Sequence, residues 1–108
     1  MPPKYVIGID LGTTNSALAY AEVGADPFAP ANVQLLGIPQ LVNPGEVREE
    51  DLLPSFLYLP GPAEFPAGTI ALPWDEERAF VAGRLAQKRG AENAGRLLRL
   101  DRAPRRLA

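Results

Sequence analysis

The sequence predicts an α/β fold in which short antiparallel β-hairpin strands outnumber one or two short helices. Its 108 residues suffice for one modest domain, and 10 glycines and 12 prolines among them argue against a helical bundle. The β-branched run Tyr5–Ile9 leads directly into turn-forming residues, which is typical of a buried strand that opens a hairpin.

The remaining elements are expected from local patterns along the chain. Residues 10–15 are dense in turn formers and separate the first strand from a second extended stretch at 16–23, so the two predict a β-hairpin. Residues 40–53 predict a long loop with its turn at Pro44-Gly45, and such a loop is either functional or poorly ordered. Further strands are expected at 32–38, 55–59 and 79–82, and a short helix at 83–89.

Composition excludes several classes of chemistry. Hydrophobic residues make up 46% and charged residues 22% of the chain, which is typical of a globular protein. The sequence has no cysteine and no histidine. Disulfides, thiolate zinc sites and catalytic triads are therefore excluded, and any chemistry depends on carboxylates, hydroxyls, amines and backbone amides.

Charge is distributed unevenly along the chain. Residues 1–83 carry three basic and eleven acidic side chains, whereas residues 84–108 carry eight basic and two acidic ones. The acidic part gives no electrostatic reason to expect nucleic acid or an anionic membrane as a partner. We find no apolar run long enough to span a membrane and no signal peptide, so we expect a cytoplasmic protein.

One motif carries chemistry, the segment Ile7–Ser16, whose central residues read Asp-Leu-Gly-Thr-Thr-Asn. A strand ends in a carboxylate, a glycine then allows the backbone to approach a ligand closely, and two hydroxyls follow. Backbone amides and hydroxyls in a tight turn suit polyphosphate oxygens, and a carboxylate suits hydrated Mg²⁺. The same residues also make good hairpin turns without any ligand, which is the alternative interpretation.

This segment closely resembles the first phosphate-binding motif of the Hsp70 chaperones, within the actin/hexokinase/Hsp70 ATPase superfamily. The resemblance extends from about Tyr5 to about Arg89 through Leu53–Leu59 and Phe80–Gly83. It implies a ribonuclease H-like (actin-like ATPase) fold, of which this chain would be the incomplete first subdomain. It also implies ATP hydrolysis coupled to the binding of unfolded polypeptides, with ATP and ADP, Mg²⁺ and co-chaperones as partners, and no membrane or specific nucleic acid.

The resemblance assigns roles to individual residues of the turn. Asp10 would hold the water molecules that coordinate Mg²⁺, and Gly12, Thr13, Thr14 and Asn15 would contact the phosphates. Thr13 would be the hydroxyl closest to the transferred phosphoryl group, so Asp10 and Thr13 are the expected catalytic residues. Lys88 lies too early in the chain to match the family's catalytic lysine.

The resemblance also predicts how the chain is divided. Residues 1–95 would be the N-terminal fragment of an Hsp70-type ATPase domain, with a proline-rich insertion at about 61–78 in which Trp74 is a partly buried anchor. The second lobe of such a domain has no counterpart here, so we expect no appreciable ATPase activity from these residues alone. Residues 96–108 would be a basic tail, either disordered or translated out of frame.

A second hypothesis concerns the tail and belongs to a different functional class. If residues 96–107 formed a helix, Arg96, Arg99, Arg102 and Arg106 would share one face, with leucines on the neighbouring face. The chain would then be a non-enzymatic binding module whose basic tail docks on an anionic partner. Pro104 interrupts that helix, which favours a solvated tail.

Overall fold

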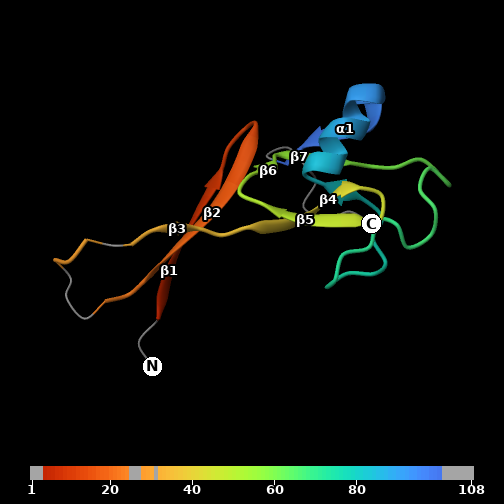
Figure 1. The fold of residues 1–108 in the computed structure, drawn as a ribbon. Helices are drawn as coiled ribbons and strands as arrows, with labels where there is room; N and C mark the ends of the chain where they lie inside the picture. Colours follow the sequence, from red (N-terminus) through yellow and green to blue (C-terminus); the bar gives the residue numbers. More distant parts are fainter. Residues whose placement is uncertain (1–3, 25–27, 31, 101–108) are drawn as a thin grey trace.

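The computed structural model describes residues 4–24, 28–30 and 32–100. They form a mixed α/β structure of three small antiparallel sheets and one α-helix (Figure 1). The elements are, in chain order, β1 (Tyr5–Leu11), β2 (Asn15–Glu22), β3 (Gln34–Leu35), β4 (Ile38–Asn43), β5 (Glu46–Glu50), β6 (Leu53–Pro54), β7 (Phe56–Tyr58), β8 (Val81–Ala82), α1 (Arg84–Glu92), the 3₁₀ turn η1 (Ala94–Arg96) and β9 (Leu97–Arg99).

The predicted hairpin at the N-terminus is confirmed. Strand β2 pairs antiparallel with β1 along the whole length of β1, from Tyr5 opposite Glu22 to Leu11 opposite Ser16. On its other side β2 pairs with β3 near its middle and with β6 at its first two residues. The second sheet is the β4–β5 hairpin, and in the third β7 lies between β8 and β9.

The hydrophobic core lies beneath α1, against the second and third sheets. Helix α1 is turned so that Leu85 and Ala86 are buried, and they pack with Tyr58 of β7 and Val81 of β8. Leu41 of β4 and Leu72 complete this cluster. Leu72, Phe65 and Ile70 all come from residues 61–78, so part of the segment predicted as a proline-rich insertion packs onto the core.

The helix begins where a glutamine side chain, and not a serine or aspartate, satisfies its first amide. The backbone N–H of Arg84 donates to Oε1 of buried Gln40 (2.9 Å), and the Gln40 amide nitrogen donates to the Leu52 carbonyl (3.0 Å). Gly83 precedes the helix with φ +84°, a conformation that favours glycine. Arg84 also pairs with Glu50 of β5 (2.7 Å from Nε).

Four sequence-based expectations differ from the structure. The strand at Tyr5–Ile9, expected to be buried, is exposed along its whole length, because β1 lies at the edge of its sheet and away from the core beneath α1. The long loop at 40–53 is wrong: β4 and β5 occupy most of it, although their turn does lie at Pro44-Gly45. Trp74, expected to be partly buried, is 64% exposed. The strand expected at 32–38 is reduced to Gln34–Leu35, with Ile38 beginning β4.

The first residues of the expected basic tail belong to the fold. Strand β9 pairs with β7, Phe56 opposite Arg99 and Tyr58 opposite Leu97. The side chain of Leu97 lies so close to Gly90 of α1 that a Cβ at Gly90 would be 2.6 Å from Leu97 Cδ2. A helix that began at residue 96 is therefore wrong for residues 97–99, and residues 101–108 lie outside the described residues.

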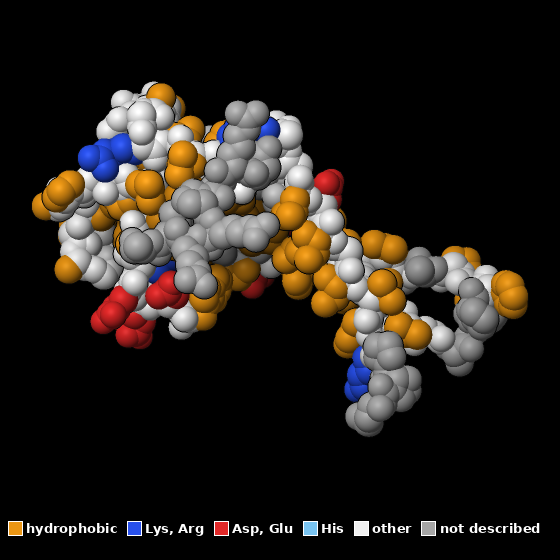
Figure 2. Space-filling model, turned by 180° about the vertical axis from the view of Figure 1, so that it is seen from behind, with side chains coloured by type: hydrophobic (Ala, Val, Ile, Leu, Met, Phe, Trp, Pro, Cys, Tyr) orange, Lys and Arg blue, Asp and Glu red, His pale blue; other side chains and the backbone are white. Residues whose placement is uncertain are grey.

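The molecule is elongated because the N-terminal hairpin extends away from the core. Its principal extents are 54 × 26 × 23 Å and its radius of gyration is 16.6 Å, against about 13 Å for a compact domain of this length. The projecting arm carries many hydrophobic side chains on its surface (Figure 2). Every residue of β1 is exposed, including Val6, Ile7 and Ile9 at more than 60%.

Candidate functional site

The residues of the predicted phosphate-binding motif lie together at one end of the β1–β2 hairpin. Asp10 is the second-last residue of β1 and pairs with Ala17 of β2. Gly12, Thr13 and Thr14 form the turn, and Asn15 begins β2 opposite Pro54 of β6. The chain reverses within a few residues, which brings all five residues together at one end of the hairpin.

Gly12 is required by the geometry of this turn. A Cβ at Gly12 would overlap the backbone carbonyl oxygen of Asn15. Backbone atoms cannot move aside as the end of a flexible side chain can, so any larger residue would open the turn. The turn itself therefore requires a glycine at position 12, and the predicted contact of Gly12 with a phosphate stays a prediction.

The polar groups of the turn are available to a ligand. Asp10, Thr13, Thr14 and Asn15 are exposed, and within residues 4–24, 28–30 and 32–100 the Asp10 carboxylate and the two threonine hydroxyls form no hydrogen bond. In the described part of the chain no three acidic side chains cluster as a metal site. Mg²⁺ keeps most of its waters and commonly uses one or two carboxylates together with substrate phosphates, so a lone Asp10 fits a metal that arrives with a nucleotide.

A pair of buried serines fixes the end of the hairpin to the core, a contact that no sequence pattern predicts. Ser16 Oγ and Ser55 Oγ are 2.9 Å apart, and the two residues are 6% and 2% exposed. The Ser55 backbone N–H donates to the Thr14 carbonyl (2.9 Å). These contacts hold the candidate site against β6, although 39 residues separate the two serines in the sequence.

Lys88 does not belong to the candidate site. It lies on α1, where Nζ donates to the Val42 carbonyl (3.0 Å) and lies 3.4 Å from Asn43 Oδ1. Its described contacts connect the helix to β4.

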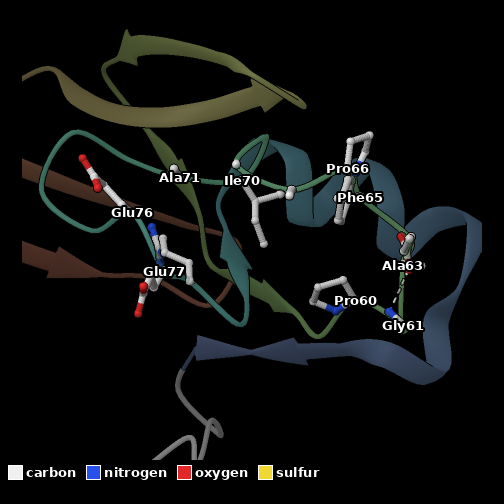
Figure 3. Close-up of a pocket in the computed structure, with 13 residues that line it drawn as sticks. Pro60, Gly61, Ala63, Phe65, Pro66, Ile70, Ala71, Glu76 and Glu77 are labelled. Atoms are coloured by element: carbon white, nitrogen blue, oxygen red, sulfur yellow. Dashed lines mark hydrogen bonds between the residues drawn. The ribbon is translucent and has the colours of Figure 1, made fainter.

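A separate cavity of about 200 Å³ lies within the proline-rich segment and contains none of the motif residues. Figure 3 shows Phe65 and Pro66 at one end of it and Glu76 and Glu77 at the other. It is smaller than the roughly 300–1,000 Å³ of typical ligand pockets. Two neighbouring glutamates are also unfavourable for a phosphate, so this cavity does not compete as a nucleotide site.

Arg78 lines the same cavity. Among the described residues, its side chain alone has a buried polar atom without a hydrogen-bond partner. Its side chain is 10% exposed, Nε has no hydrogen-bond partner among the described residues, and Asp75 is 3.8 Å away. Burial lowers the pKa of this guanidinium, and the charge rests 4.5 Å from the centre of the Phe80 ring. The cation–π contact offsets part of the free-energy cost of removing this charge from water.

Comparison with protein families, curated proteins and solved structures gives no match to this chain. Within the described residues, the single α-helix spans nine residues and is far too short to cross a membrane.

Proposed function

We propose that this chain supplies the phosphate-binding turn of an Hsp70-like, actin-type ATPase with a ribonuclease H-like fold, and that residues 10–15 bind the phosphates of Mg²⁺·ATP. The observation that carries the proposal is the turn itself. A tight glycine turn presents two threonine hydroxyls and a carboxylate, none of them hydrogen-bonded to another described residue. A turn that served only to connect two strands would not need this set of groups.

Each side chain has a distinct part in the proposed chemistry. The backbone amides of the turn and the hydroxyls of Thr13 and Thr14 donate to phosphate oxygens, and Asp10 accepts hydrogen bonds from the waters around Mg²⁺. Bound Mg²⁺ would neutralise charge on the phosphates. In an intact ATPase of this kind, hydrolysis would be coupled to the binding of unfolded polypeptide.

We expect these 108 residues to bind nucleotide without appreciable turnover. Phosphoryl transfer depends on positioning and on charge stabilisation from several sides. The candidate site is an exposed turn. Lys88, the only lysine on α1, already donates a hydrogen bond to the Val42 carbonyl of β4. A turnover rate typical of a complete ATPase, abolished by Asp10→Ala, would contradict this expectation.

Hydrogen exchange with and without Mg²⁺·ATP tests the proposal. Millimolar Mg²⁺·ATP should slow exchange at residues 10–16 and leave α1 unchanged. Asp10→Asn should weaken nucleotide binding by at least tenfold in the presence of Mg²⁺, because it removes the charge that holds the hydrated ion. Asp51→Asn is the matched control, since Asp51 is an exposed aspartate in another loop. Equal effects of both variants, or no protection at 10–16, would refute the proposal.

A further inference from the structure

Strand β1 lies at the edge of its sheet, and no other described residue pairs with its outer side. The Val23 N–H donates to the Lys4 carbonyl (2.7 Å), and these two residues continue the β1–β2 register. In an antiparallel ladder alternate residues turn their backbone groups toward the partner strand, so every second residue from Lys4 onward faces β2. The N–H and C=O groups of Tyr5, Ile7 and Ile9 therefore point outward along the open edge.

This edge lacks the features that usually prevent strands from pairing between molecules. Natural edge strands are short, charged, bulged or interrupted by proline. Strand β1 has seven residues, its register with β2 is regular, and its only charged residue is Asp10. Its outward-facing residues are also apolar and exposed, at 52% for Tyr5 and 64% for both Ile7 and Ile9.

We propose that β1 pairs antiparallel with β1 of a second copy of this chain, about a two-fold axis at Ile7. Each Lys4 then lies opposite Asp10 of the other copy, and each Tyr5 lies opposite Ile9. Opposite charges and aromatic–β-branched pairs are both favourable cross-strand neighbours. Lys4, which precedes the strand, and Asp10 near its end thus carry charges that are complementary between two copies, which favours a second copy as the occupant of this edge.

The backbone and the charges select this register over its neighbours. A shift by one residue would bring outward-facing backbone groups against residues whose groups already bond to β2, so the ladder could not form. A shift by two keeps the ladder but places Asp10 opposite Val6. Only pairing centred on Ile7 matches the ladder and neutralises both carboxylates.

The joined sheet would also cover apolar surface. A two-fold axis perpendicular to the sheet keeps equivalent side chains on one face, so Tyr5, Ile7 and Ile9 of both copies would lie side by side. Tyr20 of β2 extends this surface, since its ring lies edge-on to Tyr5 with centroids 6.0 Å apart. The order of strands across the dimer would be β2–β1–β1–β2.

Cysteine cross-linking tests the pairing, because the chain has no native cysteine. In Ile7→Cys the two thiols would face each other across a hydrogen-bonded pair with Cα atoms about 5.5 Å apart, within disulfide range. In Leu11→Cys, the matched control on the same exposed face, the two Cα atoms would be about 27 Å apart. Mild oxidation should give a covalent dimer of Ile7→Cys and none of Leu11→Cys.

A charge exchange tests the register in the otherwise unchanged chain. For the unchanged chain, light scattering should give twice the 11.6 kDa chain mass. The variant Lys4→Asp should weaken the dimer by tenfold or more, because the new aspartate would lie opposite Asp10. The double variant Lys4→Asp/Asp10→Lys should restore it. A monomer at all accessible concentrations, equal cross-linking at positions 7 and 11, or no recovery in the double variant would overturn the proposal.

The pairing goes beyond the proposed function and does not depend on it. All arms are measured without nucleotide, because Asp10 takes part in both proposals. Failure to dimerise would leave the nucleotide result intact, and failure to bind nucleotide would leave the cross-linking result intact.

Discussion

At the scale of single residues, the buried hydroxyls of Ser16 and Ser55 determine how the hairpin is anchored. We expect Ser55→Ala to lower the free energy of unfolding by about 1–3 kcal/mol, because the Ser16 hydroxyl would lose its 2.9 Å partner while remaining buried. Urea titration measures this cost. The double variant Ser16→Ala/Ser55→Ala should lose less than the sum of the single variants, and strict additivity would show that the two hydroxyls do not interact.

Glu64 makes stability depend on pH. The backbone N–H of Gly61 (3.0 Å) is the main cause that lowers the pKa of this carboxyl, and the Tyr58 hydroxyl (2.8 Å) adds to it. A lowered folded-state pKa means that the unfolded chain takes up the proton first as the pH falls. The stabilisation from Glu64 is therefore complete above the unfolded-state pKa, near 4.3, and is lost as the pH falls through the folded-state pKa.

We predict that Glu64→Gln reduces the loss of stability between about pH 5 and pH 3, because the neutral amide cannot titrate. Urea midpoints at pH 7 and pH 3 measure the change. Tyr58→Phe is the matched comparison. It should keep most of the pH dependence, since the contact with Gly61 remains. An acid response of Glu64→Gln equal to that of the unchanged chain would contradict the assignment.

The same contact acts on Tyr58 in the opposite direction. Burial is the main cause that raises the pKa of the Tyr58 phenol, and the hydrogen bond to Glu64 adds to it. The phenol therefore stays protonated and continues to donate to Glu64 throughout the neutral range.

At the scale of elements, the start of α1 depends on Gly83. We expect Gly83→Ala to be strongly destabilising, because it combines a φ of +84° with a Cβ only 2.6 Å from Gln40 Oε1, the acceptor of the first helical amide. Gly45→Ala isolates the first effect, since Gly45 has φ +74° and open space around it. That control should cost about 1–2 kcal/mol. A Cβ at Gly83 would also be 2.5 Å from Leu53 Cδ1, so equal costs for both variants would show that the close contacts with Leu53 and Gln40 are unimportant.

Helix α1 is held in place by the two strands that the sequence predicted as a loop. Arg84 pairs with Glu50 of β5, and Lys88 donates to the Val42 carbonyl of β4. Gln40 and Leu41 of β4 are buried between this helix and the other sheets. Strand β4 is therefore part of the core, and β5, which is largely exposed, contacts the helix through Glu50.

At the scale of the whole molecule, stability should be low and unevenly distributed. The exposed apolar side chains of β1 forgo burial that is worth on the order of 1.5–3 kcal/mol each, while folded domains have only about 5–15 kcal/mol in total. We predict a broad thermal transition below about 65 °C, with little increase on addition of Mg²⁺·ATP. A sharp cooperative transition above that temperature would contradict this.

Hydrogen exchange should resolve two regions in dilute protein. Amides of β7, β8 and α1, around fully buried Val81 and Leu85, should exchange slowest, and outward-facing amides of β1 should exchange fastest. Raising the protein concentration should protect the amides of Ile7 and Ile9 if β1 pairs with itself. Protection of the β2-bonded amides of Val6, Gly8 and Asp10 equal to that of the core amides would show that the hairpin and the core unfold as one unit.

Elements with local sequence signals could be predicted from the sequence alone. The β-branched run at Tyr5–Ile9, the turn formers after it and the glycine before α1 each act within a few residues, and the β1–β2 hairpin and the helix formed where these signals predicted them. The motif residues Asp10 to Asn15 share one turn for the same reason, because neighbours in a tight turn cannot lie far apart.

Features that depend on residues distant in the chain could not be predicted from the sequence. Gln40 satisfies an amide 44 positions away, Ser16 meets Ser55 across 39 positions, and Leu97 and Arg99 join a strand formed by residues 56–58. Residues 40–53 contain a proline–glycine turn and an acidic cluster, so their sequence resembles that of a solvated loop. In the folded protein, α1 covers part of them. Burial against a helix overrides weak local preference, because the free energy of strand formation comes mainly from packing and not from the backbone alone.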